Sequence, residues 1–294
     1  MKDQKRWNIA AAELIPGLSA VFTGATRAIV IPHEVLWRVP FEALPTDSGY
    51  VVDGCSVVYA SSLTALVNGD APALMTNPIS RIQDSIVAIA APALPRATVE
   101  ALARTAPGWS LRPESDGAEE MKTIGTVVDG ARTLVISGED ATEALVRERL
   151  RFGDLIDIAA PFRINGASPL FSPLLVVPDA ANDGTLEPRE IMNLPLEARL
   201  AILSDGGAMS MRDAADEVAS VAWAWRAAGV PALMMPRWQI DPAVSKTFLT
   251  TLHERLRAHD SPEAALRAAR ARVREGGAPP SAWAAWLLVG VPSN

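Results

Sequence analysis

Few side chains in this sequence can act as a nucleophile together with a base. The chain contains one cysteine, Cys55, and three histidines, His33, His253 and His259. Nucleophilic catalysis needs a thiol or hydroxyl, a base that takes its proton and returns it, and donors that stabilise the oxyanion. A catalytic pair must therefore come from these four side chains, or from a serine such as Ser204 beside one of the histidines.

Each of these side chains also has a purely structural interpretation. Cys55 directly precedes an apolar run at 56–59, and free cysteine is among the most buried residue types, so we expect a small buried side chain. His33 follows the first apolar run and is expected in a turn. His253 and His259 fall on what reads as the polar side of a helix and are expected at the surface.

Acidic residues and glycines give only weak signals for bound ions. Five acidic residues lie between positions 154 and 187, at Asp154, Asp157, Asp179, Asp183 and Glu187. Their spacing fits no metal-binding loop, and they have no histidine partner. The pair Gly206-Gly207 follows an apolar run, but the glycine pattern of a phosphate-binding loop is absent, so a turn is favoured. We expect neither a metal ion nor a cofactor.

The elements that must position any site alternate along the chain. Eight short apolar runs read as strands, at 27–31, 56–59, 85–89, 133–136, 155–158, 200–203, 232–235 and 286–290. Segments rich in Ala and Leu, with the period of a helix, separate them. Strands that are apolar throughout are typical of parallel sheets covered by helices on both faces. The sequence therefore predicts an α/β fold.

Several helix starts are recognisable from their capping side chains. Asp140 is expected to cap the helix that follows it, with Glu143 completing a capping box. Asp241 and Ser261 are each followed by proline, which suits the first position of a helix. Residues 211–228 are predicted to form a longer amphipathic helix.

Composition limits the class of protein. A length of 294 residues with 49% hydrophobic residues favours one large domain over 1–294, with possible lobes 1–120 and 121–294. The formal net charge is -7, and the 27 basic residues are scattered, which disfavours nucleic-acid binding. No apolar run reaches the roughly 18 residues that a membrane span needs. The lone cysteine and the polar N-terminus predict a cytoplasmic location.

A series of short segments resembles the CHAT domain, a caspase- and separase-related peptidase module found in bacteria. Residues 36–44 are similar to its L-x-x-x-P-F-x-A-L motif, and residues 138–142 to its G-E-x-A-T helix start. The closing residues 283–290 are similar to its W-A-A-F-x-L-x-G segment. Further similar segments lie in the same order at 59–62, 168–174, 228–232 and 238–241.

The resemblance covers almost the whole chain and implies its architecture. It predicts a caspase-like three-layer α/β sandwich, with a mostly parallel, twisted sheet and helices on both faces. In open α/β sheets, functional loops lie at the carboxyl ends of the strands.

The resemblance also locates the two catalytic positions. The family's histidine motif H-x-A-T-H-G matches residues 157–162, where Pro161 stands in place of the base. Its cysteine motif L-S-A-C-E-T matches residues 203–208, where Gly206 stands in place of the nucleophile. Proline has no ionisable group and glycine has no side chain. The resemblance thus implies a degenerate member of the family with no catalytic residues.

The favoured function is therefore that of a pseudoprotease, a protein-binding or regulatory scaffold in a bacterial system. The resemblance implies a protein or peptide partner, such as an active CHAT protease or a repeat protein that binds in trans. Whether the chain is an enzyme stays open, and inactivity is favoured.

Two alternatives remain. One is a cysteine-type peptidase with a non-standard pair, which requires His33 and Cys55 to meet or Ser204 to act with an unusual base. The other is a structural subunit of an oligomer. Trp223 and Trp225 are two residues apart on a predicted helix and project from different sides, so one of them is a candidate contact with another chain.

Overall fold

Eight strands form one sheet in the computed structural model, which describes residues 4–14, 17–47, 49–64, 85–105, 111, 132–204 and 217–290. The strands are β1 (Arg27–Val30), β4 (Ser56–Tyr59), β5 (Ser85–Pro92), β6 (Arg132–Gly138), β7 (Leu155–Ala159), β10 (Leu200–Leu203), β11 (Leu233–Pro236) and β12 (Trp286–Val289). Each lies on one of the eight apolar runs, so the strand prediction is confirmed.

The sheet consists of two parallel blocks that run in opposite directions. The strand order is β1-β4-β12-β11-β10-β7-β5-β6. Strands β1, β4 and β12 are parallel to one another, and β11, β10, β7, β5 and β6 form the second parallel block. The blocks meet at the antiparallel pair β11–β12. The expected mostly parallel sheet is confirmed, and the two blocks direct their carboxyl ends to opposite edges.

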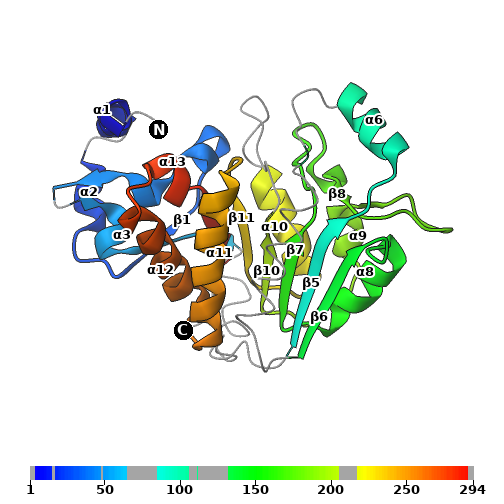
Figure 1. Cartoon of the computed structure of the whole chain (residues 1–294). Coiled ribbons are helices and arrows are strands. Elements are labelled where there is room, and N and C mark those ends of the chain that lie inside the picture. The colour runs from blue at the N-terminus through cyan, green and yellow to red at the C-terminus, as the bar shows by residue number, and fades with distance from the viewer. Residues whose placement is uncertain are drawn as a thin grey trace.

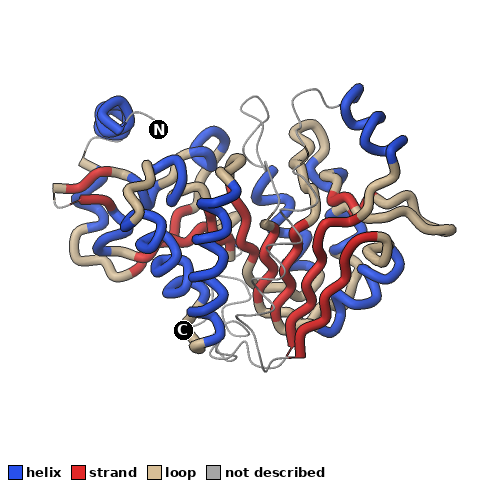
Figure 2. Tube along the Cα trace, viewed as in Figure 1, coloured by secondary structure: helices blue, strands red, loops and turns tan. Residues whose placement is uncertain are grey.

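Helices cover both faces of the sheet (Figures 1 and 2). One face packs against α8 (Glu143–Arg149), α9 (Pro188–Ile191) and α10 (Glu217–Ala227). The other packs against α11 (Pro242–Arg257), α12 (Pro262–Glu275) and α13 (Pro280–Trp283). Because successive strand residues point to opposite faces, each central strand contributes to both apolar clusters.

Shorter elements flank this framework. The helical ones are α1 (Gln4–Leu14), α2 (Leu18–Phe22), α3 (Val51–Gly54), α6 (Arg96–Thr105), η1 (Glu34–Arg38), η2 (Phe41–Ala43), η3 (Leu150–Phe152) and η4 (Pro169–Phe171). Two small hairpins, β2 (Pro45–Thr46) with β3 (Gly49–Tyr50) and β8 (Leu174–Leu175) with β9 (Thr185–Leu186), were not predicted. Their strands of two residues are too short to show a periodic pattern.

The predicted helix starts are confirmed at two positions and wrong at one. Asp241 and Ser261 cap α11 and α12, accepting hydrogen bonds from the first-turn amides. Asp140 does not cap α8, because the side chain of Thr142 does so. Glu143 then lies in the first turn of α8, and its carboxylate accepts a hydrogen bond from the amide of Gly184. The predicted helix 211–228 corresponds to α10, and residues 211–216 lie outside the described part of the chain.

Strands from both sides of residue 120 share the sheet, since β5 lies between β6 and β7. The division into one domain or two lobes remains a prediction. Within the described residues, no helix is both long and apolar enough to cross a membrane.

A buried cluster around Glu42 joins the N-terminal part of the chain to its C-terminal part. The Glu42 carboxylate is fully buried and accepts hydrogen bonds from Arg237 at 2.9 Å, from Arg270 at 2.7 Å and from the Tyr59 hydroxyl at 2.5 Å. Burial alone would raise the pKa of Glu42, but attraction by the two guanidinium groups outweighs burial and lowers it. Glu42 is therefore held as a carboxylate.

The arginines of this cluster also bind backbone carbonyl groups. Arg237 donates to the carbonyl of Trp37 at 3.3 Å and to that of Ala284 at 3.0 Å, and its guanidinium lies over the ring of Tyr59. Arg270 donates to the carbonyl of Trp286 at 2.6 Å. The cluster thereby ties η2 and β4 to β11, β12 and α12.

A second buried pair links β7 to α11. His253 Nε2 and Asp157 Oδ2 are 2.8 Å apart, and both side chains are buried. None of the polar atoms of these two side chains makes a hydrogen bond, so the pair is a close approach of the two groups. The expected surface position of His253 is wrong, because this residue shares the buried stripe of α11 with Leu249, Leu252 and Leu256. His259 is exposed, as expected.

Replacing Glu42 tests the first cluster. Glu42→Gln leaves two buried guanidinium groups without a counter-charge, so we expect the free energy of unfolding to fall by about 3–5 kcal/mol. The matched control is Glu100→Gln, which removes an exposed partner of Arg96 and should cost at most about 1 kcal/mol. Urea denaturation at pH 7 measures both variants, and equal losses would contradict the assigned role.

The Glu42 cluster also predicts a pH dependence. Because the folded pKa of Glu42 is below its ordinary value of 4.5, its contribution is present above that pH and is lost as the pH falls through the folded pKa. Wild type should therefore lose more stability than Glu42→Gln between pH 6 and the acid range. Urea denaturation of both proteins across this pH range measures the effect. An equal loss of unfolding free energy in wild type and Glu42→Gln would refute this expectation.

A double-mutant cycle tests the second pair. His253→Leu or Asp157→Leu alone leaves a buried polar partner unpaired, at an expected cost of about 3–5 kcal/mol each. The double variant removes both polar groups and should be clearly more stable than the sum of the single losses predicts. Additive losses in chemical denaturation would show that the two side chains are not coupled.

Candidate functional site

The candidate site lies at the carboxyl ends of β7 and β10, which are neighbouring parallel strands. Leu203 at the end of β10 is in register with Ile158 in β7. The amide of Ser204, the next residue, donates to the carbonyl of Ile158 at 2.9 Å. The ends of the two strands therefore lie side by side. The family resemblance assigns the histidine to the segment after β7 and the cysteine to the segment after β10.

Pro161 follows β7 and is buried. Its carbonyl accepts a hydrogen bond from the amide of Leu175 at 2.8 Å, and the next residue, Phe162, bridges to Leu174. This position contributes a rigid hydrocarbon ring and offers no proton acceptor on its side chain. Gly206, the second predicted position, lies outside the described residues, as does Asp205.

Ser204 is the described polar residue nearest along the chain to the nucleophile position. It is buried, and its hydroxyl donates to the carbonyl of Ile158 at 3.3 Å. The hydroxyl is thus engaged with the backbone of β7, and the buried imidazole of His253 lies against Asp157. The structure shows no contact between Ser204 and a histidine among the described residues.

Cys55 and His33 lie at opposite ends of a parallel strand pair. Cys55 immediately precedes β4, His33 follows β1, and Arg27 and Val30 of β1 are in register with Ser56 and Tyr59 of β4. The two side chains are therefore separated by about 13 Å of strand. The meeting that an alternative His33–Cys55 pair requires does not occur.

The individual environments of these two residues match their structural interpretations. Cys55 is 1% exposed, its thiol donates to the carbonyl of Ser56 at 3.4 Å, and burial raises its pKa. A buried thiol of raised pKa is a poor nucleophile. His33 is exposed and lies between β1 and η1, as the residue that directly precedes η1, in agreement with the expected turn position.

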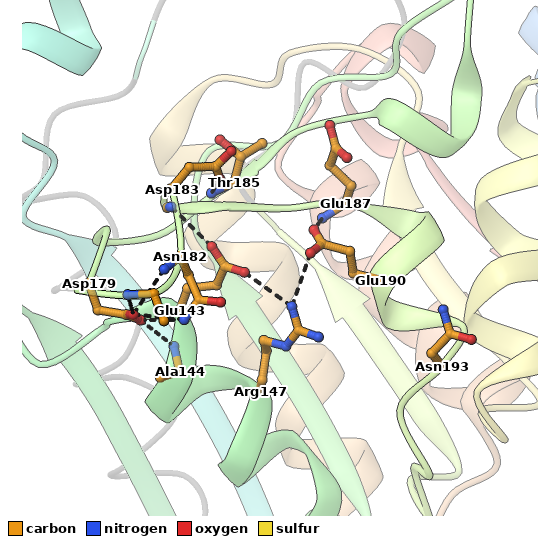
Figure 3. A network of polar contacts seen from close by, with 12 residues as sticks. Glu143, Ala144, Arg147, Asp179, Asn182, Asp183, Thr185, Glu187, Glu190 and Asn193 are labelled. Atoms are coloured by element: carbon orange, nitrogen blue, oxygen red, sulfur yellow. Dashed lines mark hydrogen bonds and ion pairs between the residues drawn. The ribbon is translucent and has the colours of Figure 1, made fainter.

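A polar network fixes the hairpin that follows the site (Figure 3). The carboxylate of Asp179 accepts hydrogen bonds from the amides of Ala144 and Ala181, at 2.8 and 2.9 Å. These amides, together with Asn182, lower the pKa of Asp179. Residues 178–184 are thereby pinned to the start of α8.

Glu143 and Arg147 of α8 complete this network. Glu143 accepts from the amide of Gly184 at 3.0 Å, and burial raises its pKa. Arg147 lies between Glu143 and Glu190, at 3.2 and 3.0 Å. The acidic residues of this region bind the protein's own amides and guanidinium groups. The described residues hold no group of three or more His, Cys, Asp or Glu side chains arranged for a metal ion.

The two tryptophans of α10 have different environments. Trp225 is 1% exposed and belongs to the core, whereas Trp223 is 47% exposed. The expectation that one of them faces outward is confirmed. Trp223 and Arg226 line a shallow hollow together with Ser61 and Gly290. This hollow lies at the amino end of β11, away from the ends of β7 and β10.

Sequence reasoning missed the polar residues of the interior. Glu42 lies inside the motif at residues 36–44, where it occupies one of the variable positions. In the structure it is the buried counter-charge of two arginines. Asp157 has no metal-loop spacing, and a carboxylate inside an otherwise apolar strand is itself a signal that a buried partner exists. The sequence therefore indicates that Asp157 has a buried partner, but it does not identify His253 as that partner.

The described fold agrees with known structures. Separase in the Saccharomyces cerevisiae separase–securin complex superposes with a TM-score of 0.55 at 15% identity, over 87% of this chain and 15% of the separase chain. The Arg-specific cysteine proteinase gingipain R superposes with a TM-score of 0.51 at 10% identity, over 82% of this chain and 55% of the other. At these identities the likeness establishes the caspase-like fold alone. This chain spans about a seventh of the length of the separase chain and about half of the length of the gingipain chain.

A sequence comparison with curated proteins found no match. The family model of the CHAT domain, in contrast, matches residues 8–291. The matched region includes the strands of the sheet, the segment of Pro161 and the segment of Gly206. The chain therefore belongs to the CHAT domain family.

Proposed function

We propose that this chain is a catalytically inactive CHAT-type protein, which binds a protein or peptide partner without cleaving it. The observation that carries the proposal is Pro161 at the carboxyl end of β7. A peptidase of this fold needs a proton acceptor there, and the ring of proline has none. Gly206 in the matched cysteine motif would remove the nucleophile as well.

Other groups do not substitute for the missing pair. The thiol of Cys55 is buried at the far end of β4 from His33. The imidazole of His253 is buried between α11 and β7, next to Asp157. A substrate carbonyl would need a nucleophile and a base within hydrogen-bond reach of each other, and the described residues bring no such pair together.

A protein partner is the favoured kind of ligand. The separase of the comparison is in a complex with securin, a protein partner, in its structure. We extend this to the present chain and propose a partner acting in trans, either an active CHAT protease or a repeat protein. We further propose that the protein is bacterial and works in the cytoplasm.

Turnover measurements test the absence of cleavage. Fluorogenic peptides containing Arg or Lys should be hydrolysed no faster by the wild type than in buffer, and Cys55→Ala should behave identically. Gingipain R on the Arg-containing peptides serves as the active control. Hydrolysis that a thiol-alkylating reagent or Cys55→Ala abolishes would overturn the proposal.

The gene neighbourhood tests the partner class. An active CHAT protease or a repeat protein encoded next to this gene should form a complex with the purified chain, observed as a joint peak in size-exclusion chromatography. A neighbouring protein of either type that elutes separately at micromolar concentration would contradict the proposed partner class.

A further inference from the structure

The two edges of the sheet differ in a way that bears on assembly. Strand β1 has four residues, begins with Arg27, which is ion-paired to Glu263, and is followed by Pro32. Strand β6 has seven residues, begins with Arg132 and carries no charge in the six residues from Thr133 to Gly138. Charges and prolines protect sheet edges against pairing, whereas a long uncharged edge favours it. Within the described residues, β6 pairs with β5 alone.

The direction of the backbone groups in β6 follows from its neighbours. The carbonyl of Ser85 accepts from Asp154 on the β7 side, so alternate residues Ile86, Ala88 and Ala90 turn toward β6. In a parallel pair these residues bond to the residues on either side of their register partners. Their register partners are Thr133, Val135 and Ser137.

The backbone N–H and C=O groups of Thr133, Val135 and Ser137 therefore point away from β5. The carbonyl of Gly138 accepts from the amide of Ala93, which agrees with the alternation because Gly138 belongs to the inward set. Ser137 supplies its carbonyl to the amide of Asp140 in the following turn, and not to β5. The outer side of β6 thus presents a row of donors and acceptors.

The sequence of β6 is complementary to itself in the antiparallel direction. With Val135 opposite Val135 of a second copy, Thr133 lies opposite Ser137 and Leu134 lies opposite Ile136. Hydroxyl side chains then face hydroxyl side chains, and apolar side chains face apolar ones. Thr133 and Val135 offer both backbone groups at hydrogen-bonded positions of this register, and Ser137 offers its N–H, because its carbonyl already accepts from Asp140. Leu134 and Val135, which are 39% and 43% exposed, would be covered.

We propose that this chain forms a two-fold dimer in which β6 of each copy pairs antiparallel about Val135. The interface is isologous, because the same strand contributes on both sides. The two sheets become continuous, and the crevice of each copy stays outside the junction. This inference is independent of whether the chain cleaves peptides.

Proline substitution at Val135 tests the proposal in the full-length chain. Val135→Pro removes an N–H that points away from β5, so the bonds to β5 are kept while the outer pairing is blocked. Sedimentation velocity should show a dimer for the wild type and a monomer for Val135→Pro. Val135→Thr keeps the N–H and the β-branched shape and should remain a dimer. Circular dichroism confirms that each variant is folded.

Disulfide trapping provides a second readout in a background of Cys55→Ala. In the proposed register the two copies of residue 135 are about 5.5 Å apart between Cα atoms, a distance that a disulfide spans. Val135→Cys should therefore give a covalent dimer on oxidation. Ser137→Cys is the matched control, because the two copies of residue 137 are about 14 Å apart and should stay uncrosslinked.

Three results would overturn the proposal. The first is a wild-type protein that stays monomeric up to high micromolar concentration. The second is equal crosslinking of Val135→Cys and Ser137→Cys. The third is a dimer that Trp223→Ala dissociates and that folded Val135→Pro leaves intact, which would place the interface on α10.

Discussion

The structure depends on one carboxylate, Glu42, that is shared between two buried guanidinium groups. Arg237 follows β11 and Arg270 lies in α12, so the carboxylate fixes both sides of the antiparallel junction relative to the N-terminal segment. Burial of unpaired arginines would cost several kcal/mol, which makes the docking of η2 obligatory rather than optional. The first parallel block is thereby joined to the second, and the crevice strands β7 and β10 are held inside a continuous sheet.

The sequence predicted the sheet well because its strands are apolar on both faces. Such runs are typical of strands covered by helices on both faces, and all eight form strands of the sheet. Pairing partners of polar residues were harder to predict. Asp140 and Thr142 both suit a helix cap, and only the tertiary contact of Glu143 with Gly184 decides between them. The polarity of His253 predicts a surface position, but its spacing from Leu249, Leu252 and Leu256 places it on the buried side of α11.

For the candidate site, the sequence predicted the place more fully than the chemistry. Register between β7 and β10 places the ends of these two strands side by side, and the positions of the histidine and cysteine motifs beyond them remain a prediction. Pro161 stands at the first of them, and its carbonyl is bound by the neighbouring hairpin, which the network of Glu143, Arg147 and Glu190 holds. Family membership and the caspase-like fold are established. The absence of catalysis is our proposal, and it follows from side-chain chemistry at this position.

Covalent labelling tests the central claim most directly. A peptide acyloxymethyl ketone reacts with an activated thiolate, and a peptide fluorophosphonate reacts with an activated serine hydroxyl. After incubation of the folded chain with each reagent, intact-protein mass spectrometry should show the unmodified mass, with Cys55 shielded by burial. A single stoichiometric adduct that maps to a residue in the crevice, and that disappears on unfolding, would show an assembled nucleophile and base and would contradict this account.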